Sequence, residues 1–181
     1  MIAALLKKFL VLVVIGCLLA IAALLLFPTL KYTIYRELPV NLRWDISYVS
    51  SDKFLVGMVF LIEQDDKLML VRHSYQSAWG LPGGWLEHGE TIRQAVRREL
   101  QEEIGAELIS TEIFEVKKPP YTPVVNIAVK CQIKLDHASF NDNEITEIRY
   151  FSKNNLPEDI LYTHKPYIER YLNASQLTAT P

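Results

Sequence analysis

The chain has 181 residues, of which 50% are hydrophobic and 22% charged, a composition that excludes global disorder and suits one domain with an additional segment. Its net charge of −2 and isoelectric point near 6.1 argue against a nucleic-acid-binding protein, which would carry a basic surface. The two cysteines, Cys17 and Cys131, lie in an apolar run and in a predicted strand. That spacing supports neither a zinc site nor a redox pair.

An apolar run near the N-terminus is the first predicted element. Residues 9–27 read FLVLVVIGCLLAIAALLLF without a charge, and a helix needs about 20 apolar residues to cross a bilayer. Lys7 and Lys8 precede the run, and Pro28 ends it. We therefore predict a short flank at residues 1–8 and an uncleaved transmembrane helix at residues 9–28, which makes this a single-pass membrane protein.

Three other interpretations of this run have specific difficulties. A cleaved signal peptide would use the small residues Ala20 and Ala22, but the apolar run continues beyond them to Phe27. A lipoprotein signal would use Cys17, which is also followed by a long apolar stretch. A core helix of a soluble protein would show a polar face, and this run has none.

Basic residues on either side of the run bear on its orientation, because positive charge marks the cytoplasmic side. Two precede it and three follow it: Lys7 and Lys8, then Lys31, Arg36 and Arg43. The count favours a cytoplasmic location for the domain that follows, by a single residue.

Residues 29–52 show no clear hydrophobic period, and Leu38-Pro39 breaks any helix, so this stretch is predicted to be a juxtamembrane linker. Tyr32, Tyr35 and Trp44 are residue types that favour the lipid headgroup region. Packing of Trp44 on the following domain is an equally weighted alternative.

The remaining chain, residues 53–173, alternates strand and helix signals. Residues 54–62 form a continuous apolar run typical of a buried strand, a polar turn covers residues 63–66, and residues 67–72 return as a hairpin partner. Further predicted strands are residues 108–109, 113–116, 125–135 and 144–151, with a polar loop at 136–143, a closing helix at 164–172 and a flexible tail at 174–181. This order predicts a mixed α/β fold.

The central helix has clear end signals. Thr91 and Gln94 have capping-box spacing, and Gly105 ends the helix. The apolar stripe of Ile92, Val96 and Leu100 is expected to face the core, with the acidic residues directed away from it.

Three carboxylates of this helix, Glu99, Glu102 and Glu103, stand at i, i+3 and i+4, so helical geometry groups them together. Like charges at this spacing repel, and acidic residues in the last turn oppose the helix dipole. A bound divalent cation would turn this penalty into a site.

The stretch from residue 84 to residue 106 resembles the Nudix box. It reads Gly84, five residues, Glu90, seven residues, then RELQEEIGA at residues 98–106; every fixed position of the family pattern is present, and only Ala106 is smaller than usual. The resemblance covers residues 53–172. It implies a Nudix-type α/β/α sandwich with a mixed sheet, and an enzyme that hydrolyses a nucleoside diphosphate linked to another moiety.

The resemblance also implies roles for individual residues. Mg²⁺ or Mn²⁺ would be held by the three glutamates together with the backbone carbonyl of Gly84, and carboxylate oxygens suit these ions. Arg98 and Glu90 would orient the metal ligands. The general base is open between Glu99 or Glu103 in the box and Glu144 beyond it, with Glu147 as a further choice.

Substrate recognition is less well defined in the sequence. Candidate phosphate contacts are Arg72, His73, Lys117 and Lys118, and candidate stacking aromatics, each with a core position as the alternative, are Tyr75, Trp79, Trp85 and Tyr121. His137 and His164 lack metal-site spacing and are interpreted as structural. The predicted ligand is a small-molecule nucleotide. The competing functions are a nucleotide-sensing module without turnover and a membrane-tethered interaction protein.

Overall fold

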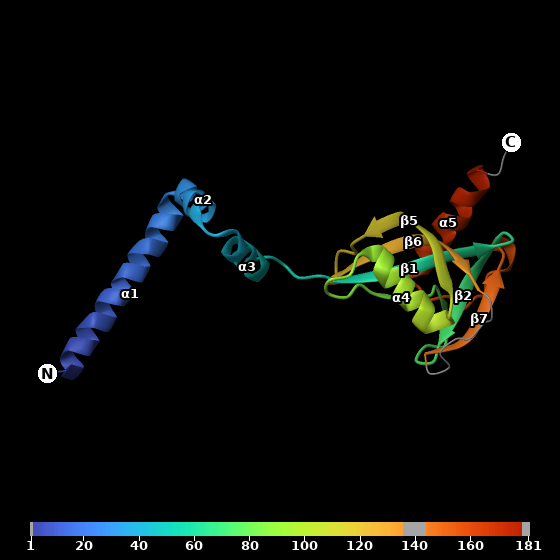
Figure 1. Ribbon diagram of the computed structural model, residues 1–181, viewed down its shortest axis with the longest axis horizontal. Helices are drawn as coiled ribbons and strands as arrows, with labels where there is room; N and C mark the ends of the chain where they lie inside the picture. The colour runs from blue at the N-terminus through green and yellow to red at the C-terminus, as the bar shows by residue number, and fades with distance from the viewer. Residues whose placement is uncertain (1, 136–143, 179–181) are drawn as a thin grey trace. The chain divides into compact units, whose positions relative to one another are not determined.

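A computed structural model describes residues 2–135 and 144–178 (Figure 1). The predicted polar loop at residues 136–143, which contains His137, and the end of the predicted tail lie outside the described residues. Contacts divide the chain into two compact units, residues 1–52 and 53–181, which are described separately.

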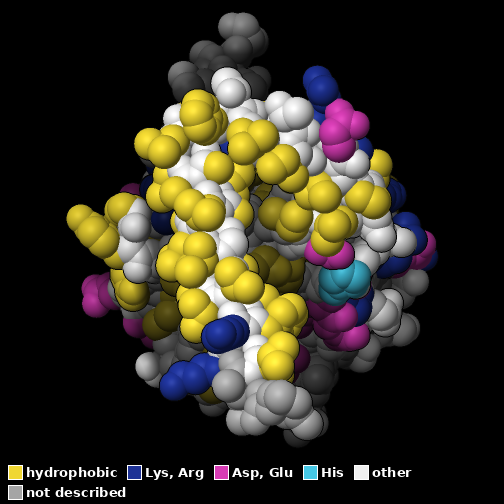
Figure 2. Space-filling model, turned by 90° about the vertical axis from the view of Figure 1, so that its left-hand side faces the viewer, with side chains coloured by type: hydrophobic (Ala, Val, Ile, Leu, Met, Phe, Trp, Pro, Cys, Tyr) yellow, Lys and Arg dark blue, Asp and Glu magenta, His cyan; other side chains and the backbone are white. Residues whose placement is uncertain are grey.

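The first unit consists of α1 (Ile2–Leu26), α2 (Pro28–Glu37) and α3 (Val40–Ser50). Within α1, residues 5–26 have a mean hydropathy of 3.2 and none is buried, and Figure 2 shows hydrophobic side chains along the helix. Within the described part of the chain, α1 therefore packs against no hydrophobic core. Its length and composition meet the requirements of a membrane span, and a signal sequence would meet them as well.

The predicted linker at residues 29–52 is helical over most of its length, in α2 and α3. Pro28 occupies the first turn of α2, where a proline costs no hydrogen bond, and Pro39 is the N-cap of α3. The predicted break at Leu38-Pro39 is confirmed, since Leu38 is extended. No residue of α2 or α3 is buried, which explains why no core-facing period marked these helices.

The second unit is built on a seven-stranded mixed sheet. Its strands are β1 (Leu55–Gln64), β2 (Lys67–His73), β3 (Trp79–Gly80), β4 (Gly83–Trp85), β5 (Glu107–Lys117), β6 (Val124–Lys134) and β7 (Ile145–Phe151). The order is β3-β2-β1-β6-β5, with β4 also paired to β1 and β7 to β2. The pairing of β1 with β6 is parallel and the other pairings are antiparallel, which confirms the predicted mixed sheet.

The hairpin between β1 and β2 follows from its turn residues. Asp65 and Asp66 both have positive φ, 51° and 59°, as the two central residues of a type I′ turn require. This turn matches the right-handed twist of the flanking strands and fixes Gln64 opposite Lys67.

The two faces of the sheet are covered by different helices, which gives the predicted α/β/α sandwich (Figure 1). On one face α4 (Ile92–Ile104) packs Val96 and Leu100 against Phe60 of β1. On the other, α5 (Lys165–Thr178) packs Ile168 against Leu61. Successive residues of β1 alternate between the two cores, so a continuous apolar run is what this strand requires. A short 3₁₀ helix, Lys153–Asn155, follows β7.

Two boundaries differ from the prediction. β5 is one strand from Glu107 to Lys117, with register shifts where two shorter strands were expected; such irregularities interrupt the alternation that sequence reading relies on. The closing helix continues to Thr178, inside the predicted tail, because no glycine or proline ends it at residue 172.

Candidate metal and hydrolysis site

The helix α4 is fixed at both ends by local chemistry. The Thr91 hydroxyl accepts from the Gln94 backbone amide, and the Gln94 side chain accepts from the Thr91 amide at 2.8 Å, which completes a capping box. Gly105 adopts the left-handed conformation that ends the helix, with φ of 65°. Both predicted ends are therefore confirmed, and the orientation of the glutamates follows from them.

The short strand β4 brings backbone amides to α4. The Trp85 amide donates to Glu99 Oε1 at 3.2 Å, and the Gly83 amide donates to Glu103 Oε2 at 3.1 Å. Between them, a Cβ on Gly84 would lie only 2.1 Å from the Glu99 carboxyl carbon. Glycine at residue 84 thus lets the strand approach the carboxylate.

Arg98 is the centre of a charged network. Its guanidinium donates to both carboxylate oxygens of Glu90, at 2.8 and 2.9 Å, and to the Trp85 carbonyl at 3.0 Å. It also lies 2.8 Å from Glu99 and 3.4 Å from Glu102. These contacts are more than a solvent-exposed Arg98 paired with Glu102 alone would make. Arg98 instead joins the helix to the loop before it.

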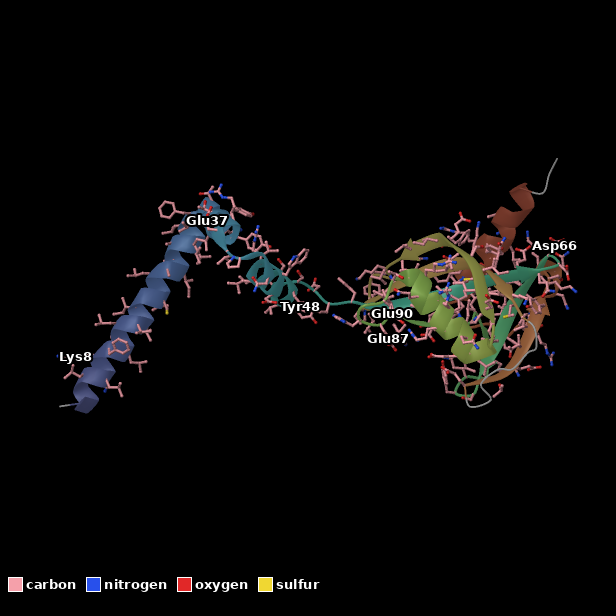
Figure 3. The ribbon with its side chains drawn as sticks, in the orientation of Figure 1. Lys8, Glu37, Tyr48, Asp66, Glu87 and Glu90 are labelled. Atoms are coloured by element: carbon pink, nitrogen blue, oxygen red, sulfur yellow. The ribbon has the colours of Figure 1, made fainter. Side chains whose placement is uncertain are left out.

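The same network shifts the pKa values of its members. The hydrogen bond from Arg98 lowers the pKa of Glu90, and the hydrogen bond to Glu90 raises the pKa of Arg98 further above its already high value. Both groups therefore stay charged. Glu87 and Glu90 lie in the loop that precedes α4 (Figure 3), and the Glu87 amide donates to Glu90 at 3.2 Å.

The prediction that the acidic face points away from the core is wrong for Glu103, because only 1% of its surface is exposed. At 100° per residue, Glu103 lies about 20° from the direction of Val96, so helical geometry places it on the apolar stripe. His73 Nε2 lies 3.6 Å from its carboxylate. Burial raises the pKa of Glu103, against the lowering effects of His73 and the Gly83 amide.

His73 was predicted as a phosphate contact, and the structure places it beside Glu103 instead, with 5% of its surface exposed. Arg72 is likewise engaged within the domain, where it pairs with Asp159 at 3.1 Å and lies 4.6 Å from the Trp79 ring centre. Trp79 is a core residue, as its alternative interpretation held. Sequence reasoning missed the pairing of His73 with Glu103 because it joins residues of two distant elements.

Glu144, the candidate base outside the box, immediately precedes β7. Its carbonyl accepts from the Ser74 amide at 2.8 Å, which brings it next to Tyr75. The pKa of Tyr75 is raised by partial burial and then by the charges of Glu103, Glu144 and Glu99. Glu144 therefore lies on the same side of the domain as the helix carboxylates. Glu147, by contrast, forms ion pairs with arginines.

The donor set can be tested against the implied ion. No preassembled group of three or more metal-ligating side chains exists within the described residues. Glu99 and Glu103 accept from β4 amides and Glu102 is exposed, so the available donors are carboxylate oxygens of the kind that Mg²⁺ and Mn²⁺ prefer. A side chain at residue 84 would collide with Glu99, so the glycine lets this carboxylate lie against β4. The chemistry of the residues fits the ion.

Comparison with known proteins gives the same result as this geometry. The class of protein is defined by an α/β/α sandwich in which amides of the glycine-containing strand β4 hydrogen-bond the glutamates of α4. Residues 54–171 match the NUDIX domain, and the chain belongs to this family of hydrolases.

Relatives and solved structures extend the comparison. The chain is 31% identical over 123 residues to human 8-oxo-dGDP phosphatase NUDT18 and 29% identical over 119 residues to an ADP-ribose pyrophosphatase of Methanocaldococcus jannaschii. These matches cover 66% and 62% of this chain, but 36% and 69% of the two relatives. A NUDIX hydrolase from Nitrosomonas europaea superposes with a TM-score of 0.59 at 26% identity, over 72% of this chain and 76% of that one.

Proposed function

We propose that this protein is a divalent-metal-dependent pyrophosphohydrolase that cleaves the diphosphate of a nucleoside diphosphate linked to another moiety. The observation that carries the proposal is the arrangement of Glu99 and Glu103 on the amides of β4, in a chain of the Nudix family. The names of the two curated relatives, an 8-oxo-dGDP phosphatase and an ADP-ribose pyrophosphatase, support this substrate class.

Mg²⁺ or Mn²⁺ would be held by Glu99, Glu102, Glu103 and the carbonyl of Gly84. When bound, such an ion neutralises the charge of the diphosphate and acidifies the attacking water. Arg98 would position these ligands through its bonds to Glu90 and to the Trp85 carbonyl, since it holds the loop against the helix.

A carboxylate would take the proton from the attacking water, and the candidates are Glu99, Glu103 and Glu144. The position of Glu144 supports it as a candidate for the base, because its charge acts on Tyr75 together with the charges of Glu99 and Glu103. Within the box, burial raises the pKa of Glu103, which makes it a stronger base than an exposed glutamate.

Residues 9–28 would anchor this enzyme in a membrane, with residues 53–173 as the catalytic domain on the cytoplasmic side and residues 174–181 as a C-terminal extension. The apolar surface of α1, in which no residue from 5 to 26 is buried, supports the anchor. Protease treatment of intact cells would test the side: the domain should be protected, and degradation without cell lysis would place it outside.

Phosphate release from a nucleotide panel tests the enzymatic function. The full chain in detergent should turn over at least one diphosphate derivative with Mg²⁺ and none with EDTA. Glu103→Gln should lose orders of magnitude in turnover but keep its folding stability, because the buried site favours a neutral side chain. Binding without turnover in the wild type would indicate a sensor, and an absence of both would contradict the proposal.

A further inference from the structure

The helices α2 and α3 are held together by a tyrosine. The Tyr35 hydroxyl of α2 lies 2.9 Å from Ser47 Oγ and 3.4 Å from the Arg43 carbonyl oxygen, both of α3. Only two residues separate the helices along the chain. Residues 28–50 therefore form a short helical hairpin, which we call the juxtamembrane hairpin.

A cavity of about 210 Å³ lies between the two helices of this hairpin. It is lined by Tyr35 of α2 and by Val40, Arg43 and Trp44 of α3. The three residues of α3 share one side of the helix, because side chains three and four positions apart are neighbours. No Asp or Glu of the described residues lines the cavity, so the Arg43 guanidinium gives it a net positive charge.

Arg43 has hydrogen-bonding capacity that the protein does not use. Its Nε atom is buried and has no hydrogen-bond partner among residues 2–135 and 144–178. Arg36 of α2, by contrast, donates from Nε to Glu37 at 3.0 Å. Native proteins leave few buried donors unpaired. An anionic oxygen in the cavity would supply the missing acceptor, and the planar fork of a guanidinium matches a phosphate group.

The first turn of α3 favours the same charge in a ligand. Its N-cap is Pro39, and no side chain caps the helix. The first amides of a helix point outward and carry partial positive charge, which attracts anions. Val40, the first residue of α3, lines the cavity, so this helix end and the arginine act on the same space.

The surface around the cavity suits a lipid. Trp44 is 70% exposed, and Leu42, Tyr48 and Val49 are exposed as well. Only Phe27 separates α2 from α1, whose length and composition suit a membrane span. Tryptophan and tyrosine are enriched at the membrane–water interface, at the level of the lipid headgroups. A phosphate-binding cavity in this part of the chain would therefore meet phospholipids.

We propose that the cavity of the juxtamembrane hairpin binds the phosphodiester of a phospholipid headgroup, with Arg43 contacting the phosphate and Trp44 the adjoining part of the lipid. A water molecule takes about 30 Å³ of liquid, so about 210 Å³ holds a headgroup phosphate and not a whole phospholipid. The inference rests on the membrane location proposed for residues 9–28, and it is independent of the reaction proposed for residues 53–173.

Lipid binding to the full chain in dodecyl maltoside tests this inference. The probes are dioctanoylphosphatidylglycerol and dioctanoylglycerol, which has the same chains and no phosphate, and native mass spectrometry measures the bound fraction. We expect Arg43→Gln to weaken binding of the phospholipid about tenfold or more, because a charge-assisted hydrogen bond is lost, and to leave binding of dioctanoylglycerol unchanged.

Two further variants keep the test specific. Arg43→Lys preserves the charge but removes the Nε donor and the fork, so it should also weaken phospholipid binding, even if Arg43→Gln folds poorly. Arg36→Gln removes a charge from the same hairpin, at a side chain that is 75% exposed and outside the cavity, and it should bind as the wild type does.

Several results would overturn the inference. They are equal binding of the two probes by the wild type, wild-type affinity in both Arg43 variants, and equal losses in Arg43→Gln and Arg36→Gln. Displacement of the phospholipid by an equimolar concentration of inorganic phosphate would overturn it as well, because the ligand would then be a soluble anion.

Alkaline extraction of membranes that contain the full chain separates this inference from the proposed anchor. If the protein stays in the membrane but Arg43→Gln binds the phospholipid as the wild type does, the anchor stands and the headgroup site is wrong. If alkali extracts the protein but phospholipid binding still depends on Arg43, the anchor fails and the headgroup site stands. Turnover with Mg²⁺ in detergent should be the same in Arg43→Gln as in the wild type.

Discussion

Glu99 and Glu103 lie one turn apart on α4, bind amides of the same short strand, and have opposite environments. The side chain of Glu99 is 13% exposed, and its carboxylate lies 2.8 Å from the Arg98 guanidinium. The side chain of Glu103 is 2% exposed, and its carboxylate lies 3.6 Å from His73 Nε2. A fixed positive charge balances the first, whereas burial raises the pKa of the second.

This difference shows how one helix turn can supply two kinds of acidic ligand. The alternation of β4 presents the amides of Gly83 and Trp85 to α4, and each amide takes one carboxylate. A cation bound between them would compensate the buried negative charge of Glu103. The comparison predicts that changes near Glu99 and changes near Glu103 affect the protein differently.

Replacing the glycines of β4 should have the largest effect. Gly84→Ala places a Cβ within 2.1 Å of the Glu99 carboxylate, a flexible group that can move away, so the protein should fold and lose about a hundredfold in kcat/KM. Steady-state kinetics and circular dichroism on the full chain would measure both properties.

The neighbouring variant Gly83→Ala is the control for position. Its Cβ would lie 2.1 Å from the Met58 carbonyl, and backbone cannot yield as a side chain can, so folding stability itself should fall. If Gly84→Ala instead unfolds the domain while Gly83→Ala is tolerated, the role assigned to Glu99 is wrong.

Removing the fixed charge beside Glu99 should have the next largest effect. Arg98→Gln breaks the bonds to Glu90 and to the Trp85 carbonyl, and loss of such a supporting residue costs about 10- to 100-fold in activity or metal affinity. Arg97→Gln removes the same charge from an exposed position one residue away and should be neutral. Equal losses in the two variants would show that only net charge matters.

The smallest predicted effect concerns His164, a buried histidine whose pKa is lowered by burial and then by the nearby His73. Because burial lowers its folded pKa from 6.5 to about 4, its contribution to stability is complete above pH 6.5 and is lost as pH falls towards 4. Between pH 8 and pH 5.5 the loss should be about 1.4 kcal/mol in the free energy of unfolding.

His164→Asn keeps an acceptor for the Leu81 amide and cannot titrate, so it should lack this part of the pH dependence. Urea unfolding of both proteins at the two pH values provides the comparison. The same loss in wild type and variant would mean that other groups cause it.

Much of the site could be predicted because its determinants are local. The capping box at Thr91, the stop at Gly105 and the spacing of the glutamates each depend on a few neighbouring residues. The helical period that buries Val96 also buries Glu103. The prediction placed Glu103 in solvent because carboxylates usually prefer it.

Other features depend on tertiary structure and left no local signal. His73 meets Glu103 only after β2 takes its place in the sheet, and Gly57 lies between Trp85 and Asn126 only through pairings of three strands. The helices α2 and α3 bury no residue, so no core-facing stripe distinguished them from a linker.

Mn²⁺ binding to the full chain tests most directly whether the two carboxylate environments form one metal site. Calorimetric titration of the wild type, Glu99→Gln and Glu103→Gln should show a loss of affinity of about tenfold or more in each variant, while Glu112→Gln, an exposed acidic residue outside the site, should match the wild type. Unchanged Mn²⁺ affinity in either Glu99→Gln or Glu103→Gln would contradict the shared site.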